Sequence, residues 1–285
     1  MNKEKVIDIV DFEKEYVQLQ DKIGSIERNL QAFQFDYANK ISGKFDTYQI
    51  SSTRTDLTLK LNSIMYIVRL MNQEKMRTVL YLENQLIKNG NDLISDSLNL
   101  IQNQKTLFDS ILYHVSSVYD YYAILSDYLY NYKSSLKWNG LVKSAHNITN
   151  SKISPAHKEF ITKSHKEFVN SIFSHRSYLI HSGTSNAGYR ITRNTKQDKI
   201  TIELITPHKF IKEFKELELF SEGRPISLEA SLFWILNKGL SNIISLIYGL
   251  KTEINNLRKI DAKDAIIFDS DGSSENLTER MWVIE

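Results

Sequence analysis

The sequence predicts a mainly α protein: an antiparallel helical bundle with one small β-hairpin and a long N-terminal helical extension. Apolar residues recur three and four positions apart over long stretches, the spacing that places side chains on one face of a helix. The 285 residues include only 10 Gly and 3 Pro, so few residues would break a helix. Near residues 189–205, apolar and polar residues instead alternate, as they do in strands.

The first stretch predicts an amphipathic helix over residues 6–41, either unbroken or divided near Gly24. Its apolar residues at helical spacing are Phe12, Tyr16, Leu19, Ile23, Ile26, Leu30, Phe33 and Tyr37. Residues 42–55 are polar and include a glycine, so we expect a loop there. Residues 1–55 would then form the N-terminal helical extension.

A main helical bundle is expected over residues 56–260. Asp56 is a suitable N-cap for a helix that runs to about Lys88, and a third helix is predicted over residues 93–132. Tyrosines are frequent at the centre of this third helix: Tyr113, Tyr119, Tyr121, Tyr122, Tyr128, Tyr130 and Tyr132. They favour a packing face whose hydroxyls find partners, with a base-stacking platform as the alternative.

The clearest helix start follows a predicted loop over residues 138–154. Ser154 can cap the helix, and Pro155 occupies the first helical position, where its missing N–H costs nothing. We expect this helix to end near His181, because Gly183 can adopt the left-handed conformation that stops a helix.

After the predicted hairpin, Ser227 is expected to cap a last helix that ends near Ile260. The apolar segment 228–250 is interrupted by polar residues, so we interpret it as a buried helix and expect no membrane span. The acidic tail, residues 261–285, is expected to be loosely held except where residues 281–284 could dock.

The composition excludes several classes of site. The chain has no Cys, which rules out disulfides, thiolate catalysis and Cys-based zinc sites. His157, His165 and His175 lack the spacing of metal ligands, so we expect neither a metal nor another cofactor. The net charge of +2 is too close to neutral to indicate a nucleic-acid partner by itself. The N-terminus has no signal-peptide stretch, and a cytoplasmic protein is expected.

One short motif stands out at the end of the helix that begins after Ser154. Arg176 is followed, after four residues, by His181. Arg stays charged and can hold a phosphate through two hydrogen bonds, whereas His titrates near neutral pH and can transfer protons. These two kinds of group suffice for metal-independent cleavage of RNA by its own 2′-hydroxyl. Chance alone predicts roughly 0.7 such pair in this chain, so the weight of the motif comes from its place in the helix.

Residues 175–183, His-Arg-Ser-Tyr-Leu-Ile-His-Ser-Gly, resemble the R-x4-6-H signature of HEPN domains, an all-α nucleotide-binding fold. The resemblance implies a HEPN-like bundle over residues 56–260, with the motif late in one helix and two protomers paired so that both motifs line one cleft. It implies Arg176 and His181 as the catalytic pair of an endoribonuclease. It also implies RNA as the substrate, a toxin or antiviral-defence role, and a regulatory partner such as an antitoxin.

Helix geometry bears on how the pair would act. Positions 176 and 181 lie about 140° apart around an ideal helix. The two side chains would meet only if the helix unwinds near Ile180, or if each reaches the cleft from a different protomer. We therefore expect a homodimer with a composite site. The alternative is a surface ion pair for Arg176 and a helix-ending contact for His181.

Four neighbours are expected to contact the substrate: Ser177, His175, Arg190 and Arg193. Arginines of the hairpin would follow an RNA backbone through charge, and an ordinary solvated hairpin is the alternative. HEPN ribonucleases often carry Asn, Asp or His directly after the Arg, where this chain has Ser177. That residue and the near-neutral charge favour a second hypothesis, a catalytically inactive HEPN-like helical module for dimerisation or for binding a nucleotide or protein.

Overall fold

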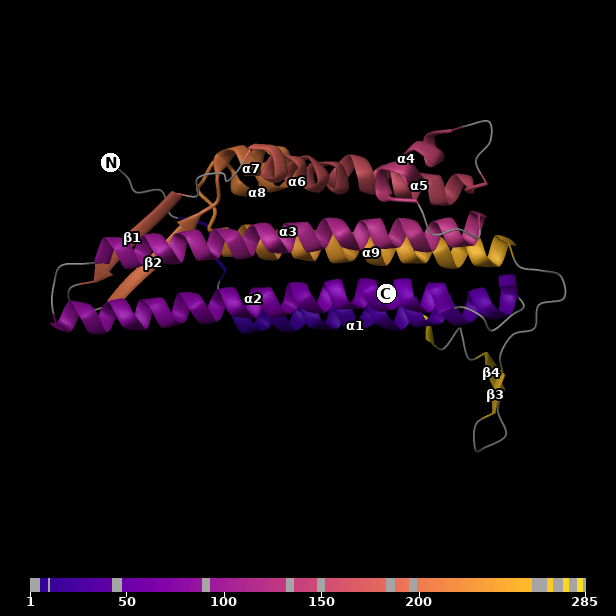
Figure 1. The fold of residues 1–285 in the computed structure, drawn as a ribbon, viewed down its shortest axis with the longest axis horizontal. Coiled ribbons are helices and arrows are strands. Elements are labelled where there is room, and N and C mark those ends of the chain that lie inside the picture. The colour runs from indigo at the N-terminus through magenta and orange to yellow at the C-terminus, as the bar shows by residue number, and fades with distance from the viewer. Residues whose placement is uncertain are drawn as a thin grey trace. The chain divides into compact units, whose positions relative to one another are not determined.

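The structure is a computed structural model that describes residues 6–9, 11–42, 48–88, 93–131, 136–147, 152–182, 188–194, 199–257, 266–268, 274–276 and 281–283 (Figure 1). Most of these residues are helical, which confirms the predicted mainly α fold with a small β-hairpin. The elements are α1 (Phe12–Asp36), the π-helical turn η1 (Tyr37–Ser42), α2 (Tyr48–Lys88), α3 (Leu93–Asn131), α4 (Trp138–His146), α5 (Pro155–Ser164), the π-helical turn η2 (His165–Val169), α6 (Asn170–Ser182), β1 (Gly188–Asn194), β2 (Lys199–Ile205), α7 (His208–Glu213), α8 (Lys215–Ser221), α9 (Leu228–Leu257), β3 (Ile266–Phe268) and β4 (Ser274–Asn276).

The chain divides into two compact units. Unit 1 comprises Met1–Tyr16, Asn62–Val115 and Ser171–Asn237, and unit 2 comprises Val17–Leu61, Ser116–Asn170 and Lys238–Glu285. Each unit therefore draws on segments from early, middle and late in the sequence. Contacts between such distant segments hold each unit together.

The first predicted helix is confirmed in its centre and wrong at its start. Helix α1 continues through Gly24 without a break and passes into the π-helical turn η1. It begins only at Phe12, and before it Ile7 forms an isolated β-bridge with Ile226. The N–H of Ile7 donates to the carbonyl of Pro225 (2.8 Å), and the carbonyl of Ile7 accepts from the N–H of Ser227 (2.8 Å).

The loop predicted over residues 42–55 is wrong for its second half, because α2 already begins at Tyr48. The polar residues there are compatible with a helix. The hydroxyls of Thr53 and Thr55 each donate to the backbone carbonyl four residues earlier, at 2.9 Å, and Ile50 is buried. These hydrogen bonds satisfy the threonine hydroxyls within the helix, and burial of Ile50 outweighs the low helix propensity of the segment.

Another predicted loop, residues 138–154, contains the short helix α4. Four of its residues are buried: Trp138, Leu141, Val142 and Ala145. They lie three and four positions apart, so one face of α4 packs into the core of unit 2. Burial of this face outweighs the Asn-Gly turn signal near its start.

The helix predicted to begin after Ser154 is confirmed over its whole length. The Ser154 side chain accepts from the N–H of His157 at 3.2 Å, with Pro155 in the first turn. The helix runs as α5, the π-helical turn η2 and α6, and ends at Ser182. A π-helical turn shifts the side chains after it to a different face of the helix.

The predicted hairpin is also confirmed. Strands β1 and β2 pair antiparallel, from Gly188 opposite Ile205 to Asn194 opposite Lys199. Ile202 and Leu204 of β2 are buried on one face. Helices α7 and α8, which were not predicted, follow the hairpin and bury Phe210, Ile211 and Leu217 in unit 1.

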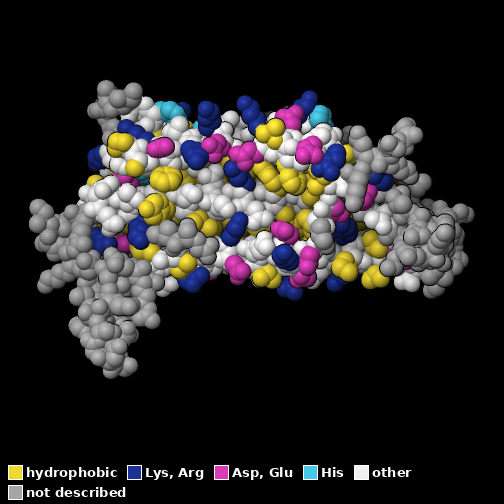
Figure 2. Space-filling view, turned by 180° about the vertical axis from the view of Figure 1, so that it is seen from behind, with side chains coloured by type: hydrophobic (Ala, Val, Ile, Leu, Met, Phe, Trp, Pro, Cys, Tyr) yellow, Lys and Arg dark blue, Asp and Glu magenta, His cyan; other side chains and the backbone are white. Residues whose placement is uncertain are grey.

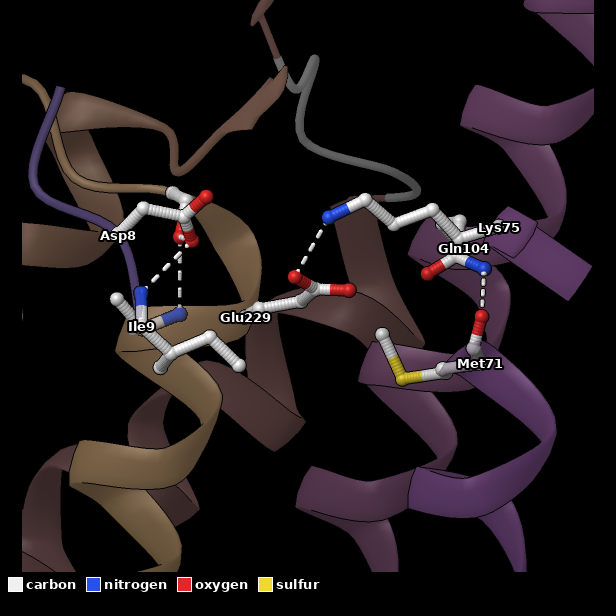
Figure 3. Close-up of polar contacts among 8 residues, drawn as sticks. Asp8, Ile9, Met71, Lys75, Gln104 and Glu229 are labelled. Carbon is white, nitrogen blue, oxygen red and sulfur yellow. Dashed lines mark hydrogen bonds and ion pairs between the residues drawn. The ribbon is translucent and has the colours of Figure 1, made fainter. Parts of the chain in front are cut away.

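In unit 1, polar side chains connect α2, α3 and α9 (Figure 3). Lys75 of α2 lies 2.7 Å from the carboxylate of Glu229 in the first turn of α9. The side-chain amide of Gln104, on α3, donates to the carbonyl of Met71, on α2, at 2.7 Å. Gln104 is fully buried, so this hydrogen bond sets the register of the α2–α3 pair.

Helix α9 begins as predicted, since the Ser227 hydroxyl accepts from the N–H of Ala230 at 3.0 Å. It is the one helix in the described part of the chain that is long and apolar enough to cross a membrane. Of its most apolar window, 61% is buried inside the protein. This burial agrees with its interpretation as a buried helix.

In unit 2, His157 of α5 forms the centre of a buried hydrogen-bond network. The Tyr122 hydroxyl donates to the carbonyl of Leu246 at 2.9 Å, so its oxygen accepts from the Nε2–H of His157 at 2.6 Å. The Tyr130 hydroxyl then donates to Nδ1 of the same ring. This arrangement requires a neutral imidazole, and burial lowers the pKa of His157 to about 3.

The burial of four tyrosines of α3 distinguishes between a packing face and a base-stacking platform. Tyr119, Tyr122, Tyr128 and Tyr130 are buried, and each hydroxyl has a hydrogen-bond partner. These four therefore form a packing face, as favoured from the sequence. Tyr113 is about half exposed, and Tyr132 lies outside the described residues.

Two glycines of unit 2 should respond oppositely to alanine. A Cβ at Gly249 would lie 2.8 Å from Cδ2 of the His157 ring, whereas a Cβ at Gly24 would meet no atom within 4 Å. We expect Gly24→Ala to stabilise the protein by about 0.5–1 kcal/mol, because it restricts the unfolded chain. We expect Gly249→Ala to destabilise it by about 1–3 kcal/mol, because the ring is held on both sides. Urea unfolding followed by circular dichroism measures both, and equal effects of the two substitutions would contradict the packing described.

Candidate functional site

The Arg-His motif lies in the last two turns of α6, in unit 1. Helix α6 stays helical through Ser182, so it does not unwind near Ile180. Positions 176 and 181 therefore remain about 140° apart around the helix axis. The backbone of His181 is part of the helix, but its side chain lies outside the described residues.

His175, beside the motif, is a buried residue and not a solvated one. Its side chain is 3% exposed and lies between two carboxylates. Nδ1 is 3.3 Å from Glu213 of α7, and Nε2 is 3.8 Å from Asp109 of α3. The prediction that His175 contacts substrate is therefore wrong for this structure, because the ring is enclosed by protein.

The charge of this cluster can be inferred from its surroundings. Burial lowers the pKa of His175, but the carboxylates of Asp109 and Glu213 raise it by more, so its pKa lies above the ordinary value. The imidazolium also meets the ring of Phe210 edge-on, at 4.7 Å between centroids. His175 therefore ties α6 to α3 and α7 by charge as well as by packing.

Arg176 points to a different environment from that of His175. Its guanidinium lies 4.7 Å from the centroid of the Tyr113 ring, on α3, and 5.9 Å from that of Phe173, on α6. Arg176 is half-buried and Tyr113 is 47% exposed, so this cation–π contact lies at the surface. The guanidinium is thus held in place next to solvent, where an anion could reach it.

The other residues that were predicted to contact the substrate lie on α6 and β1. Ser177 is exposed on α6. Arg190 of β1 lies opposite Glu203 of β2 and forms an ion pair with it at 3.6 Å, so part of its charge is neutralised. Arg193 belongs to β1, but its side chain lies outside the described residues.

Surface charge gives no further guide to a nucleic-acid interface. On the face shown in Figure 2, the coloured Lys, Arg, Asp and Glu side chains are interspersed. This mixture accords with the net charge of +2. Among the described residues, no group of three or more His, Asp or Glu side chains is arranged to hold a metal ion.

A polar groove in unit 2 was not predicted. Its volume is about 850 Å³, and α1 and α2 provide most of its lining. Three cationic side chains, Lys22, Arg28 and Arg54, line it together with Asp21 and Glu27. The hydroxyls of Ser25 and Thr58 add further polar groups. No sequence signal identifies such a groove, because its two sides come from separate helices.

Comparison of the chain with protein-family models, with curated protein sequences and with solved structures finds no match. The resemblance to HEPN domains therefore rests on the motif and on the helical fold.

The charged state of His175 leads to a prediction about stability and pH. Its folded pKa lies above the unfolded value of about 6.5, so its contribution is fully present below that pH. The contribution is lost as pH rises through the folded pKa. We expect His175→Gln to cost about 2 kcal/mol at pH 6, because it leaves two partly buried carboxylates without their cation, and clearly less at pH 9. Urea unfolding across this range measures the difference.

His208→Gln is the matched control, because it removes an exposed imidazole at the start of α7. The free energy of unfolding of this variant should change with pH in the same way as that of the wild type. A His175→Gln deficit that stays constant from pH 6 to pH 9 would show that folding does not raise the pKa of this imidazole.

Proposed function

We propose that the protein is a metal-independent endoribonuclease of HEPN type, with Arg176 and His181 as its catalytic pair. The observation that carries the proposal is the setting of Arg176. It lies half-buried against Tyr113, next to solvent, in the last turns of a helix that His175 fixes from the other side. A guanidinium held in this way can bind a phosphodiester with little loss of side-chain entropy.

The proposed chemistry needs proton transfer as well as charge. The 2′-hydroxyl of RNA attacks the adjacent phosphorus, a base accepts the hydroxyl proton, and an acid protonates the leaving 5′-oxygen. Arg176 stabilises the charge of the phosphorane, and His181 transfers protons. The end of a helix favours the imidazolium form of a histidine, which suits the acid.

The continuous α-helix supports a composite site in a homodimer. Positions 176 and 181 face about 140° apart, so a single chain does not direct both toward one phosphate. In a symmetric dimer, each interface patch meets its own copy. Arg176 of one protomer and His181 of its partner then complete one site. A toxin or antiviral-defence role in the cytoplasm, with a regulatory partner such as an antitoxin, belongs to the same proposal.

Activity and complementation test this proposal together. Purified protein with single-stranded RNA and EDTA should yield fragments that end in 2′,3′-cyclic phosphate. Arg176→Ala and His181→Ala should each reduce cleavage at least about 100-fold, as loss of a proton-transfer or charge-stabilising group does. Arg224→Ala and His208→Ala, which change exposed side chains, should retain activity.

Mixing the two inactive variants tests the composite site. Random pairing should restore about a quarter of wild-type activity, because half of the dimers are mixed and each mixed dimer contains one intact site. No restoration would place both residues of a site in one chain. Undiminished cleavage by His181→Ala would overturn the endoribonuclease assignment.

A second candidate function is a helical module that binds a nucleotide without cleaving RNA. The polar groove of unit 2 favours it, because Lys22, Arg28 and Arg54 can attract phosphate groups and the adjacent hydroxyls can donate to them. Asp21 and Glu27 in the same lining can accept from the hydroxyls of a ribose or the amino group of a base.

Calorimetry with ATP and with inorganic pyrophosphate tests this second candidate. The Arg28→Ala, Arg54→Ala double variant should weaken binding at least about tenfold, because each charge-assisted hydrogen bond is worth about 1.5–3 kcal/mol. Arg224→Ala should leave affinity unchanged. Binding that is absent, or equal in the double variant, would eliminate the groove as a nucleotide site.

A further inference from the structure

The segment Met281–Val283 lies in a seat built by α1 and α9 of unit 2. Trp282 is 7% exposed, although the tail that leads to it, residues 269–280, is largely polar and acidic. The docking expected for residues 281–284 is therefore confirmed for Trp282. Buried polar groups, and not only apolar contacts, hold the segment.

Asn29 of α1 recognises the backbone of the segment. Its side-chain amide donates to the carbonyl of Val283 at 2.8 Å, and its side-chain oxygen accepts from the N–H of Val283 at 2.7 Å. Both groups of one residue can face one partner in this way when the backbone is extended. Asn29 is 2% exposed, so both of its polar atoms would lose their partners if the segment left.

Asp36, also on α1, recognises the indole. The Nε1–H of Trp282 donates to Oδ2 of Asp36 at 2.8 Å, and Asp36 is 1% exposed. Its other oxygen lies 3.1 Å from Nζ of Lys40, which is likewise buried and donates to Asn255 of α9 at 3.3 Å. A buried carboxylate with only one cationic partner requires a further donor, and the indole provides it.

The third contact comes from α9. Nζ of Lys251 lies 5.3 Å from the centroid of the Trp282 ring, a cation–π contact. The seat thus contacts the indole of Trp282 at its N–H and at its ring. It binds Val283 through hydrogen bonds to the backbone alone. It sets no requirement on the side chain of Val283 through hydrogen bonds, so its specificity lies in the tryptophan.

We infer that this seat is a peptide-recognition site that accepts the same segment from a second copy of the chain. The bound segment itself identifies the occupant, because every copy carries it. The contacts depend on the residues of the segment and not on the chain that leads to it. Within one chain, the tether gives the segment an effective concentration on the order of millimolar, so exchange between copies becomes significant where copies are held side by side. The inference does not depend on the proposed ribonuclease activity.

A peptide tests whether the seat recognises the segment without its tether. A fluorescent peptide of residues 279–285 is titrated into the full-length Trp282→Ala variant, whose seat keeps Asn29 and Asp36, and into the wild type. We expect binding to the variant at least about tenfold tighter than to the wild type, whose own segment competes. A Trp282→Ala version of the peptide should not bind. Absent binding, or equal binding to both proteins, would overturn the inference.

Two full-length variants test the second copy as the source. Asn29→Ala keeps the segment and weakens the seat, whereas Trp282→Ala keeps the seat and weakens the segment. Mixed and differently labelled, they should show energy transfer that the unlabelled peptide abolishes. A partner chain that carries both substitutions is the matched control, and any association through another surface persists in it. Peptide binding without association of the chains beyond this control would exclude a second copy as the occupant. Circular dichroism of each variant establishes that it is folded.

Discussion

The placement of α6 depends on a single buried cation. His175 lies between Asp109 of α3 and Glu213 of α7, and its ring packs against Phe210. Three helices of unit 1 therefore share one charge. Ser171 reinforces the same contact, since its hydroxyl donates to the carbonyl of Glu213 at 2.6 Å. Because Arg176 is the next residue, this cluster also sets the direction in which its guanidinium leaves the helix.

Two histidines on the same continuous stretch of helix are buried in opposite states. His157 of unit 2 is surrounded by tyrosine hydroxyls, which satisfy a neutral ring without providing charge. His175 of unit 1 faces carboxylates, which favour the charged ring. The state of each ring thus follows from its partners and not from its depth, since both are at most 3% exposed. Protonation of His157 at low pH would disrupt the first arrangement, and deprotonation of His175 at high pH would weaken the second.

Sequence reasoning located most helices because the apolar spacing of a buried helix face is local information. The cap at Ser154, the helix end near Ser182 and the position of the hairpin were all predictable from neighbouring residues. The predictions that were wrong failed because burial against distant segments determined the local structure. Residues 48–55 and the helix α4 had the polarity of loops, but Ile50 and Trp138 are buried against other segments. Spacing within one segment does not reveal such partners.

The candidate site was predictable only in part, for the same reason. The sequence identified Arg176 by its place near a helix end, and α6 does end there. It could not identify Tyr113, Asp109 or Glu213, because these residues approach α6 from separate helices. The burial of His175 followed from that approach, which explains why a residue expected at the surface lies inside.

The seat of Trp282 has a consequence for the order in which unit 2 folds during synthesis. Asn29 and Val283 are separated by 254 positions in the chain, although their atoms meet. At ribosomal rates of about 5–20 residues per second, α1 emerges tens of seconds before its last partner exists. Throughout that interval, the amide of Asn29 and the carboxylate of Asp36 must remain in contact with water or with a temporary partner. The inner face of α1 is therefore a surface that the nascent chain leaves incomplete until its last residues have been made.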